Sequence, residues 1–519
     1  MQTKQKTESV FDESMKNLNA PAENIPVSLS LEKNICTMDS LFENVDTLVS
    51  RRFENVLEKE ISFCIYFSDG VSDSRLINED IMKPLLLSDK LMPGAGIFDA
   101  VKSHFLFVNE IIEATNMKEI IEAVTYGDTI LFIEGSSKAV IMNSKLFTTR
   151  AVNEPETEKV LLGPREGFNE SLMTNLSMLR RRLRTNLLKM QMMNIGRKST
   201  TNICVCYLDT IVNKKILAEL LRRLEKIDID AILDSNYISE FITESSFLAI
   251  PTSGHTERPD IAAAKLLEGR IAVFVDGSPV VLTLPYLFLE NFHSNEDYYM
   301  NHLYTTFSRI LRMFSFFLTL SIPAIFISAV AFHHEILPTA LMIHFSSERM
   351  NVPLPAAAEC LIMQICFDLL REAGVRMPSQ VGQALSIVGA LVIGQAGVEA
   401  KLVASPMIIV VALTGITGLT VPKLSPTSIV CRYSFLLFSS YFGLYGFMIG
   451  FSFFFTHLLS LKSIGVPILS VPSRLRYQDI KDSVIRSSWS KMLTRYAPLT
   501  DNLVRAKSER SAEDGGVPS

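Results

Sequence analysis

Hydrophobic residues are distributed very unevenly along this chain of 519 residues, and their pattern divides it into two parts. Between Met313 and Leu461 only 12 of 149 residues are Asp, Glu, Lys or Arg, whereas the other 370 residues hold 93 of the 105 charged side chains. Apolar runs of about 20 residues are long enough to cross a bilayer as helices. The pattern therefore predicts a polar, water-exposed part that adjoins an all-α membrane part.

Two segments of the polar part resemble each other. Residues 61–69 are similar to residues 202–209, with Tyr66 and Tyr207 at an offset of 141, and residues 127–136 are similar to residues 269–278 at an offset of 142. Each copy has the pattern of a β-branched strand, a helix and a hairpin with an acidic-Gly-Ser turn. We therefore predict an α/β domain of two similar subdomains. The helix of the second copy is predicted over Asn213–Lys226.

A run of basic residues lies between the two copies. The sequence predicts a helix over Leu172–Met193 that carries Arg180, Arg181, Arg182 and Arg184. Such a run is either a solvated basic face or an ionic contact with a partner subunit or with anionic lipid. The residue types alone leave both interpretations open.

Two short polar turns contain the candidate contact residues of this α/β domain. Arg165 and Glu166 lie in a turn bracketed by glycines, where we expect them to pair across the interface between the subdomains. Glu257, Arg258 and Asp260 lie at the start of a predicted helix and have N-capping character. Neither turn combines a nucleophile with a base or has the spacing of metal ligands. We therefore predict no enzymatic activity and no catalytic, cofactor-binding or metal-binding residues.

The composition bears on partners and on compartment. The net charge of −5 is mild and argues against a nucleic-acid partner. Among the seven cysteines, Cys204 and Cys206 lie two apart on a predicted strand, and we interpret them as small buried side chains rather than metal ligands. The first 30 residues lack the apolar region of a secretory signal, so we expect the N-terminal domain to stay in the cytoplasm.

The membrane part is predicted to cross the bilayer about four times. Met313–Phe332 and Tyr433–Leu461 are uncharged and long enough to span, and Gly382–Val398 and Ser405–Val421 are shorter candidates. Basic residues precede the first span, and residues 462–519 contain ten Lys or Arg against six Asp or Glu. Both termini are therefore predicted to be cytoplasmic.

A fifth apolar element, Leu354–Leu370, is predicted to be re-entrant or interfacial because polar residues lie along it. At about 100° per residue, its later polar positions fall on one helical face, where Asp368 and Arg371 are spaced to pair. Glu359 lies on the opposite side. The polar face is either interfacial, with an ordinary salt bridge, or the wall of an aqueous pore. The candidate pore or gating residues are Glu359, Gln364, Asp368, Glu372, Gln383 and Gln395.

Small residues cover one face of the span Gly382–Val398. Their spacing of about four residues is the small-xxx-small pattern that lets helices approach closely. It predicts oligomers or tight packing within one chain. The candidate packing residues are Gly382, Ser386, Gly389, Ala390 and Gly397.

Several of these motifs resemble one protein family. The block Arg-Glu-Ala-Gly-Val-Arg-Met-Pro at residues 371–378 and the Gly-rich ladder at residues 382–396 are similar to the A subunits of bacterial spore germinant receptors, the GerA family. The resemblance extends from about Ser40 to Leu499. The other matching segments are residues 163–168, Thr256–Asp260 and residues 268–279.

This resemblance implies a multi-pass protein in the inner membrane of a dormant endospore, with a cytosolic two-lobed N-domain. It implies assembly with a transporter-like B subunit and a lipoprotein C subunit. It also implies contact with membrane lipid and self-association into a ligand-gated cation channel that triggers germination. A non-conducting scaffold subunit is the alternative function, and a spore-specific paralogue is the alternative subtype.

The expected domain boundaries follow from these patterns. They are residues 1–35 for a flexible tail, 36–160 for the first subdomain, 161–200 for a linker with the basic helix, 201–300 for the second subdomain, 301–465 for the membrane domain and 466–519 for a cytosolic C-terminal tail.

Overall fold

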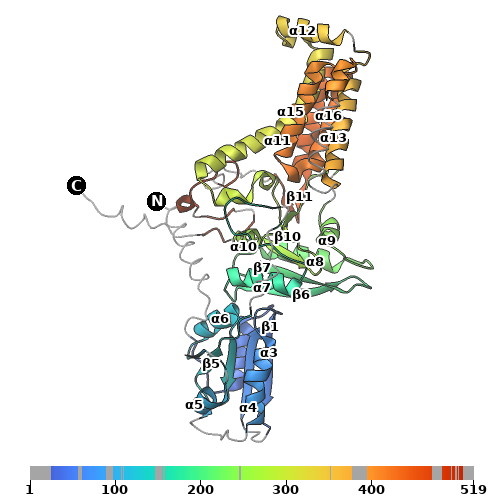
Figure 1. Cartoon of the computed structure of the whole chain (residues 1–519). Coiled ribbons are helices and arrows are strands. Elements are labelled where there is room, and N and C mark those ends of the chain that lie inside the picture. Colours follow the sequence, from blue (N-terminus) through green and yellow to red (C-terminus); the bar gives the residue numbers. More distant parts are fainter. Residues whose placement is uncertain are drawn as a thin grey trace, which may run out of the picture.

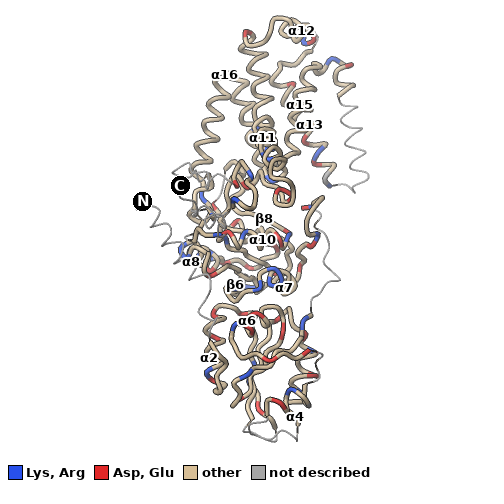
Figure 2. The backbone as a smooth tube through the Cα atoms, turned by 90° about the vertical axis from the view of Figure 1, so that its left-hand side faces the viewer, with Lys and Arg blue, Asp and Glu red and all other residues tan. Residues whose placement is uncertain are grey.

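The computed structural model describes residues 25–56, 61–88, 97–106, 108, 110–146, 155, 158–244, 247–350, 352–376, 394–469, 482–492, 494–496, 499–500 and 502–505. They form an elongated molecule with two α/β subdomains at one end and a helical bundle at the other (Figure 1). Charged residues are frequent along the chain of the subdomains and sparse along that of the bundle (Figure 2). The two parts that the charge pattern predicts are therefore separate in space.

The first subdomain is an antiparallel sheet of five strands in the order β1-β2-β4-β5-β3. Alternate residues of a strand face opposite sides of a sheet, so Cys64 and Tyr66 pack under α2 and α6, while Phe63 and Ile65 face the helical segments between β2 and β3. The bounds are α2 Leu31–Leu41, β1 Leu48–Glu54, β2 Ser62–Ser68, α3 Ser74–Leu76, η2 Ile77–Met82, α4 Lys83–Leu87, α5 Ile97–Ala100, η3 Val101–Phe105, β3 Ile111–Ala114, α6 Met117–Tyr126, β4 Thr129–Ile133 and β5 Ala139–Met142.

The second subdomain has the same architecture, with strands in the order β6-β7-β9-β10-β8. Helices α7 and α10 cover the face that contains Cys204 and Cys206, and α8 and α9 cover the other face. Both thiols are buried and free. The bounds are α7 Leu172–Arg182, β6 Leu188–Ile195, β7 Thr201–Leu208, α8 Lys214–Glu225, α9 Ser235–Ile242, β8 Gly254–Thr256, α10 Pro259–Leu267, β9 Ile271–Val275 and β10 Val281–Leu284.

The repeat that the sequence indicates is visible in this topology. Corresponding strands start at nearly constant offsets, since β1 and β6 start at residues 48 and 188 and β4 and β9 start at residues 129 and 271. The turn of each hairpin contains a glycine with positive φ, Gly135 at 80° and Gly277 at 84°. This conformation costs glycine little because it has no Cβ. The two subdomains are therefore two copies of one unit.

The predicted helix Leu172–Met193 is wrong in its second half. Helix α7 ends at Arg182, and residues from Leu188 onward form strand β6, which pairs with β7 along its whole length. Leu and Met favour helices in isolation, but pairing with a neighbouring strand overrides this weak preference. Part of the predicted linker 161–200 therefore belongs to the second sheet.

The four arginines of this region form contacts within the chain. Arg180 is buried and donates a hydrogen bond to Thr47 of the first subdomain, and the Arg184 guanidinium lies 3.7 Å from the centre of the Tyr126 ring. The other two, Arg181 and Arg182, bind Glu166. The basic run therefore joins the subdomains and holds the turn before α7.

The bundle consists of helices that run roughly side by side and pack through apolar faces (Figure 1). It is joined to the second subdomain by a cluster in which Phe288 and Phe292 pack against Phe316, and Phe316 in turn lies beside Phe454. The bounds are η4 Phe288–Phe292, η5 Asn295–Tyr298, α11 His302–Ala331, η6 His334–Ile336, α12 Thr339–Arg349, α13 Ala356–Arg376, α15 Ser405–Leu419, η7 Pro422–Leu424, α16 Ser425–Ser460, β11 Lys462–Ser463, β12 Val466–Pro467 and η8 Trp489–Lys491.

Element α16 is a helical hairpin rather than one straight helix. Its backbone is non-helical at Gly443, with φ 59° and ψ −138°. The rings of Phe435 and Phe454 lie 6.4 Å apart, whereas 19 residues of straight helix would separate them by about 28 Å. Thr427, near the start, donates a hydrogen bond to the carbonyl of Ala249 in the second subdomain, so both ends of the hairpin lie beside the sheets.

This hairpin corrects the predicted span Tyr433–Leu461, which is not a single crossing. Among the described residues, α11 and the segment 422–460 are long and apolar enough to cross a membrane, and α15 is a shorter apolar helix. Since the segment 422–460 folds back on itself, the count of four crossings does not follow from the structure. Most of the predicted span Gly382–Val398 lies outside the described residues.

Candidate functional site

Glu359 is buried in the first turn of α13 and contacts the start of another helix. Its Oε1 atom accepts a hydrogen bond of 2.6 Å from the backbone N–H of Ala404, the residue that precedes α15. The first N–H groups of a helix have no partner within it, and the helix dipole favours negative charge there. Glu359 therefore joins α13 to the start of α15. The pattern of residues along α13 gives no sign of this partner.

Asp368 binds a buried arginine of the hairpin. Its Oδ2 atom lies 2.6 Å from Arg432 Nη2 and accepts a hydrogen bond of 2.8 Å from the hydroxyl of Tyr433. The predicted pair with Arg371 is present at 3.6 Å but is longer and more exposed. Asp368 therefore joins α13 to the first arm of α16, and the polar face of α13 contacts neighbouring helices at this level.

Gln364 lies between these two acids on α13 and is fully buried. Among the described residues, neither its Oε1 nor its Nε2 atom has a hydrogen-bond partner, and Oε2 of Glu359 and Nε of Arg432 also lack one. Buried polar groups without partners are costly, and in native proteins they often mark bound water, ions or function. The interior of the bundle therefore contains buried polar groups without protein partners, on α13 and on the first arm of α16.

The remaining predicted residues of the membrane part are exposed, in contact with a neighbouring residue, or outside the described residues. Glu372 is exposed and pairs with Arg376, one helical turn away. Gln395 is exposed, and Gly397 lies against Val403. Gln383 and the packing residues Gly382, Ser386, Gly389 and Ala390 lie outside the described residues.

The junction between bundle and sheets contains a charge cluster that the sequence patterns do not indicate. Arg309 of α11 is fully buried, with Asp297 Oδ2 at 2.7 Å from its Nε and Asp482 Oδ1 at 3.0 Å from its Nη1. Arg312 binds Asp297 as well. In the sequence, these arginines are only the basic residues that precede the first predicted span and indicate its cytoplasmic end. The structure shows that they tie α11 to η5 and to the segment that starts at residue 482.

His293 lies in the same junction and is partly buried. Its Nε2–H donates a hydrogen bond of 2.7 Å to the carbonyl of Ser483. Burial, together with the positive charges of Arg309 and Lys265, holds the pKa of His293 well below its usual value of 6.5. The imidazole is therefore neutral in the folded protein.

The predicted turn at residues 256–260 is held together by Arg258, which is fully buried. Its guanidinium binds both carboxylate oxygens of Asp260, at 3.1 and 3.0 Å, and donates to the carbonyls of Glu158 and Pro164. Glu257 bonds through its backbone to Glu158 and to Phe168. These contacts fasten residues 158–168 to helix α10. Arg165 is exposed, and Glu166 pairs within the second subdomain, not across the interface as predicted.

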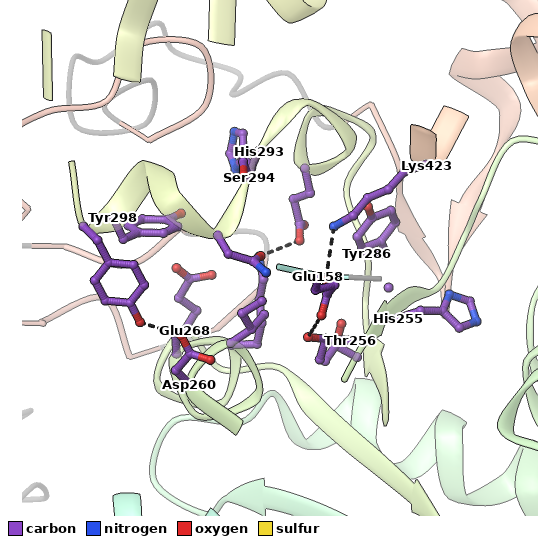
Figure 3. Close-up of a pocket in the computed structure, with 18 of the residues that line it drawn as sticks. Glu158, His255, Thr256, Asp260, Glu268, Tyr286, His293, Ser294, Tyr298 and Lys423 are labelled. Atoms are coloured by element: carbon purple, nitrogen blue, oxygen red, sulfur yellow. Dashed lines mark hydrogen bonds and ion pairs between the residues drawn. The ribbon is translucent and has the colours of Figure 1, made fainter. Parts of the chain in front are cut away.

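A cavity of about 160 Å³ lies between α10, η5 and the short helix η7, which carries Lys423 (Figure 3). Its polar groups pair with one another: Lys423 lies 4.0 Å from Glu158, and Lys265 lies 2.6 Å from Glu290. Burial and a hydrogen bond to Asp260 raise the pKa of Tyr299 to about 12. No group of three or more His, Cys, Asp or Glu suited to a metal ion occurs in the described part of the chain.

Comparison with known proteins places this architecture in a family. The model of the Bacillus/Clostridium GerA spore germination protein family matches residues 36–497. The uncharacterized membrane protein YfkQ of Bacillus subtilis (strain 168) is 37% identical, over 91% of this chain and 91% of its own length. Spore germination protein KA of the same organism is 37% identical, over 89% of this chain and 85% of its own.

Further similar proteins carry germination names. Spore germination protein A1 of Bacillus subtilis (strain 168) is 33% identical, over 86% of this chain and 92% of its own length. The crystal structure of the N-terminal domain of the A subunit of the Bacillus megaterium spore germinant receptor GerK3 matches with a TM-score of 0.41 and 29% identity, covering 51% of this chain and 98% of that chain.

The fold thus defines a protein whose duplicated α/β domain is fastened to a helical bundle, and its long apolar helices indicate membrane association. The chain belongs to the GerA family of spore germination proteins, the family of germinant receptor A subunits. This finding confirms the resemblance inferred from the sequence motifs.

Proposed function

We propose that this protein is the A subunit of a nutrient germinant receptor and that several copies assemble into a ligand-gated cation channel. The single observation that carries the channel proposal is the unpaired amide group of Gln364 inside the bundle. Gln364 is fully buried with neither amide atom paired among the described residues, and it lies between the acids Glu359 and Asp368. Polar groups inside a membrane protein that lack protein partners typically face water or an ion path.

The bundle geometry supports a membrane placement for these groups. Each arm of the α16 hairpin has about 17 residues, or about 26 Å of helix, close to the hydrocarbon thickness of a bilayer. Helix α13 has 21 residues but is not among the helices apolar enough to cross, so we propose that it is the re-entrant or interfacial element expected from the sequence. Because α11 and both ends of the hairpin meet the sheets on the same side, we propose that the α/β domain and both chain termini are cytoplasmic.

The family relationship supports the remaining parts of the proposal. Such a receptor acts in the inner membrane of the endospore, together with a transporter-like B subunit and a lipoprotein C subunit. In this arrangement the junction around Arg309 is the mechanical link between the cytosolic domain and the bundle, because it joins α11, η5 and the segment from residue 482.

The test uses the full chain with its B and C subunits in liposomes loaded with potassium, and a mixture of L-amino acids and sugars as the probe. We expect potassium release, and we expect Gln364→Leu to reduce it without loss of folded protein. Thr414→Val is the matched control, because Thr414 is equally buried but donates to Val410 of its own helix. Unchanged release in Gln364→Leu would contradict a conduction path past this residue.

A second candidate function is a non-conducting scaffold, which the Asp368–Arg432 pair favours. This pair and the Glu359–Ala404 contact are the kind of interactions that fix helix positions. If the protein is a scaffold, the liposomes release no potassium with any variant. The B and C subunits nevertheless co-purify with the chain in an affinity purification. For a channel, release occurs and depends on Gln364.

A further inference from the structure

The first four turns of α11 carry a stripe of exposed apolar side chains. Leu303, Phe307, Ile310 and Phe314 are between 48 and 70% exposed and follow one another at spacings of four, three and four residues. The opposite side of the same turns is buried, where Arg309 binds Asp297 and Asp482. The helix is therefore fastened to the cytosolic domain on one side and open on the other.

A groove runs along this stripe. It has a volume of about 430 Å³ and lies between the start of α11 and residues 485–491. Its wall on one side is formed by Leu303, Phe307 and Ile310. On the other side are Ile485, two serines and the basic residues Arg486 and Lys491, and no acidic residue lines it among the described residues. The groove thus combines an apolar wall with a positive end.

Arg486 is the residue at this positive end whose position is fixed by burial and by contacts with its neighbours. It is only 3% exposed, and its Nε and Nη2 atoms have no hydrogen-bond partner among the described residues. Its Nη1 donates to the carbonyl of Ser487, and its guanidinium lies 5.3 Å from the centre of the Trp489 ring. An arginine held this way offers a fork of N–H donors to an oxyanion such as a phosphate.

The length of α11 indicates that the groove lies near the level of the lipid headgroups. Helix α11 has 30 residues, or about 45 Å of length, whereas the hydrocarbon core is about 30 Å thick. The surplus of about ten residues falls on residues 302–312, because the apolar span continues to Ala331 at the other end. The exposed stripe is thus continuous with the membrane-facing surface of the same helix.

We propose that this groove binds an anionic phospholipid, with an acyl chain along Leu303, Phe307 and Ile310 and the phosphate at Arg486 and Lys491. The proposal rests on the membrane placement of α11 and not on channel activity. Continuity with the span favours a lipid over a second copy of the chain, and the apolar wall favours a lipid over free phosphate. A lipid held here contacts the α11 junction and so links membrane composition to the position of that helix.

The only tryptophan of the chain, Trp489, provides the readout. The full chain is placed in nanodiscs of phosphatidylcholine that contain a small fraction of either phosphatidylglycerol or phosphatidylcholine with brominated acyl chains. Bromine quenches tryptophan fluorescence on close approach. We expect stronger quenching by the brominated phosphatidylglycerol than by the same fraction of brominated phosphatidylcholine.

Two variants and a control define the result. Arg486→Gln and Lys491→Gln should each reduce the preference for the anionic lipid about five-fold, the contribution of one basic residue near an anionic surface. Lys491 is exposed, so its variant should fold even if Arg486→Gln does not. Lys462→Gln is the matched control, an exposed lysine at the sheet end of α16 that does not line the groove.

Three outcomes would overturn the proposal. Equal quenching by both brominated lipids would mean ordinary contact with the bilayer. Loss of the preference in millimolar inorganic phosphate would mean a site for a free anion. Absent quenching, together with cross-linking between copies of a Phe307→Cys variant, would mean that a second copy covers the groove.

Discussion

The guanidinium of Arg432 lies 2.6 Å from the carboxylate of Asp368, inside a bundle in which charged residues are rare. This contact joins α13 to the first arm of the α16 hairpin. Arg432 is 2% exposed, so removal of the carboxylate leaves a buried charge without compensation. It follows that the pair fixes how the two helices pack.

The first prediction concerns this pair. Asp368→Asn should lower the free energy of unfolding by about 3–5 kcal/mol, because Arg432 would stay buried without its counter-ion. The double variant Asp368→Leu/Arg432→Leu should recover most of the loss. Thermal unfolding of the protein in detergent measures both. Glu372→Gln is the control, because its pair with Arg376 is exposed and should contribute little.

The second prediction concerns the turn of the hairpin. Gly443→Ala should destabilise the protein by about 1–3 kcal/mol, because φ near 59° with ψ near −138° is almost restricted to glycine. A Cβ at this position would also lie 2.9 Å from the Cβ of Phe332. Gly465→Ala is a useful comparison, since its φ is positive but no atom lies within 4 Å of the added Cβ. A smaller loss in Gly443→Ala than in Gly465→Ala would contradict the packing at this turn.

The third prediction tests the fold of the hairpin in a membrane. Tyr445 is 75% exposed next to the turn, at the end of the bundle away from the sheets. In a variant without native cysteines, Tyr445→Cys should react with a membrane-impermeant maleimide from the side opposite to the α/β domain. Lys462→Cys should react only from the side of that domain. A single span over Tyr433–Leu461 predicts instead that position 445 lies in the hydrocarbon and does not react.

The fourth prediction concerns the start of α15. Glu359→Ala should lower the free energy of unfolding by about 1–3 kcal/mol, because the N–H of Ala404 would lose its buried acceptor. Glu359→Gln keeps an acceptor oxygen and should lose less than Glu359→Ala, mainly the favourable charge at the helix start. Chemical unfolding in detergent compares the two. Equal losses would show that the charge, and not the hydrogen bond, dominates.

The fifth prediction concerns pH. The pKa of His293 is held below its usual 6.5 in the folded protein, so the unfolded chain binds a proton first as the pH falls. The contribution of His293 to the free energy of unfolding should therefore be fully present above pH 6.5 and be lost below it. The loss from this group is at most about 1.4 kcal/mol per pH unit. His293→Gln should remove this part of the decline between pH 6.5 and 5. The exposed His344→Gln should leave it unchanged.

Local patterns were sufficient where the structure depends on residues close together in sequence. The apolar run at residues 61–69 predicts a strand, and the structure has β2 there, packed on both faces. The acidic-Gly-Ser motifs likewise predicted the two hairpin turns correctly. The helix over Leu172–Met193 failed at its second half because strand pairing with β7, a contact from another part of the chain, decides the state of those residues.

The candidate residues of the membrane part show the same division. The spacing of Asp368 and Arg371 predicts their pair correctly, since both lie on one helix. Arg432 lies 64 residues away, and no local pattern connects it to Asp368. A signal was nevertheless present, because a lone arginine at the start of an apolar segment needs an acid somewhere in the bundle.

By itself, the sequence determined that this protein has a duplicated α/β part and an apolar helical part, and it carried enough motifs to indicate the GerA family. These properties reside in periodicity, composition and short ordered blocks, which are local in the chain. Only the tertiary structure decided that Tyr433–Leu461 folds back at Gly443, that Glu359 meets α15 and that Arg309 joins the two parts. Those outcomes depend on which distant groups share a buried environment, and burial is a property of the packed chain.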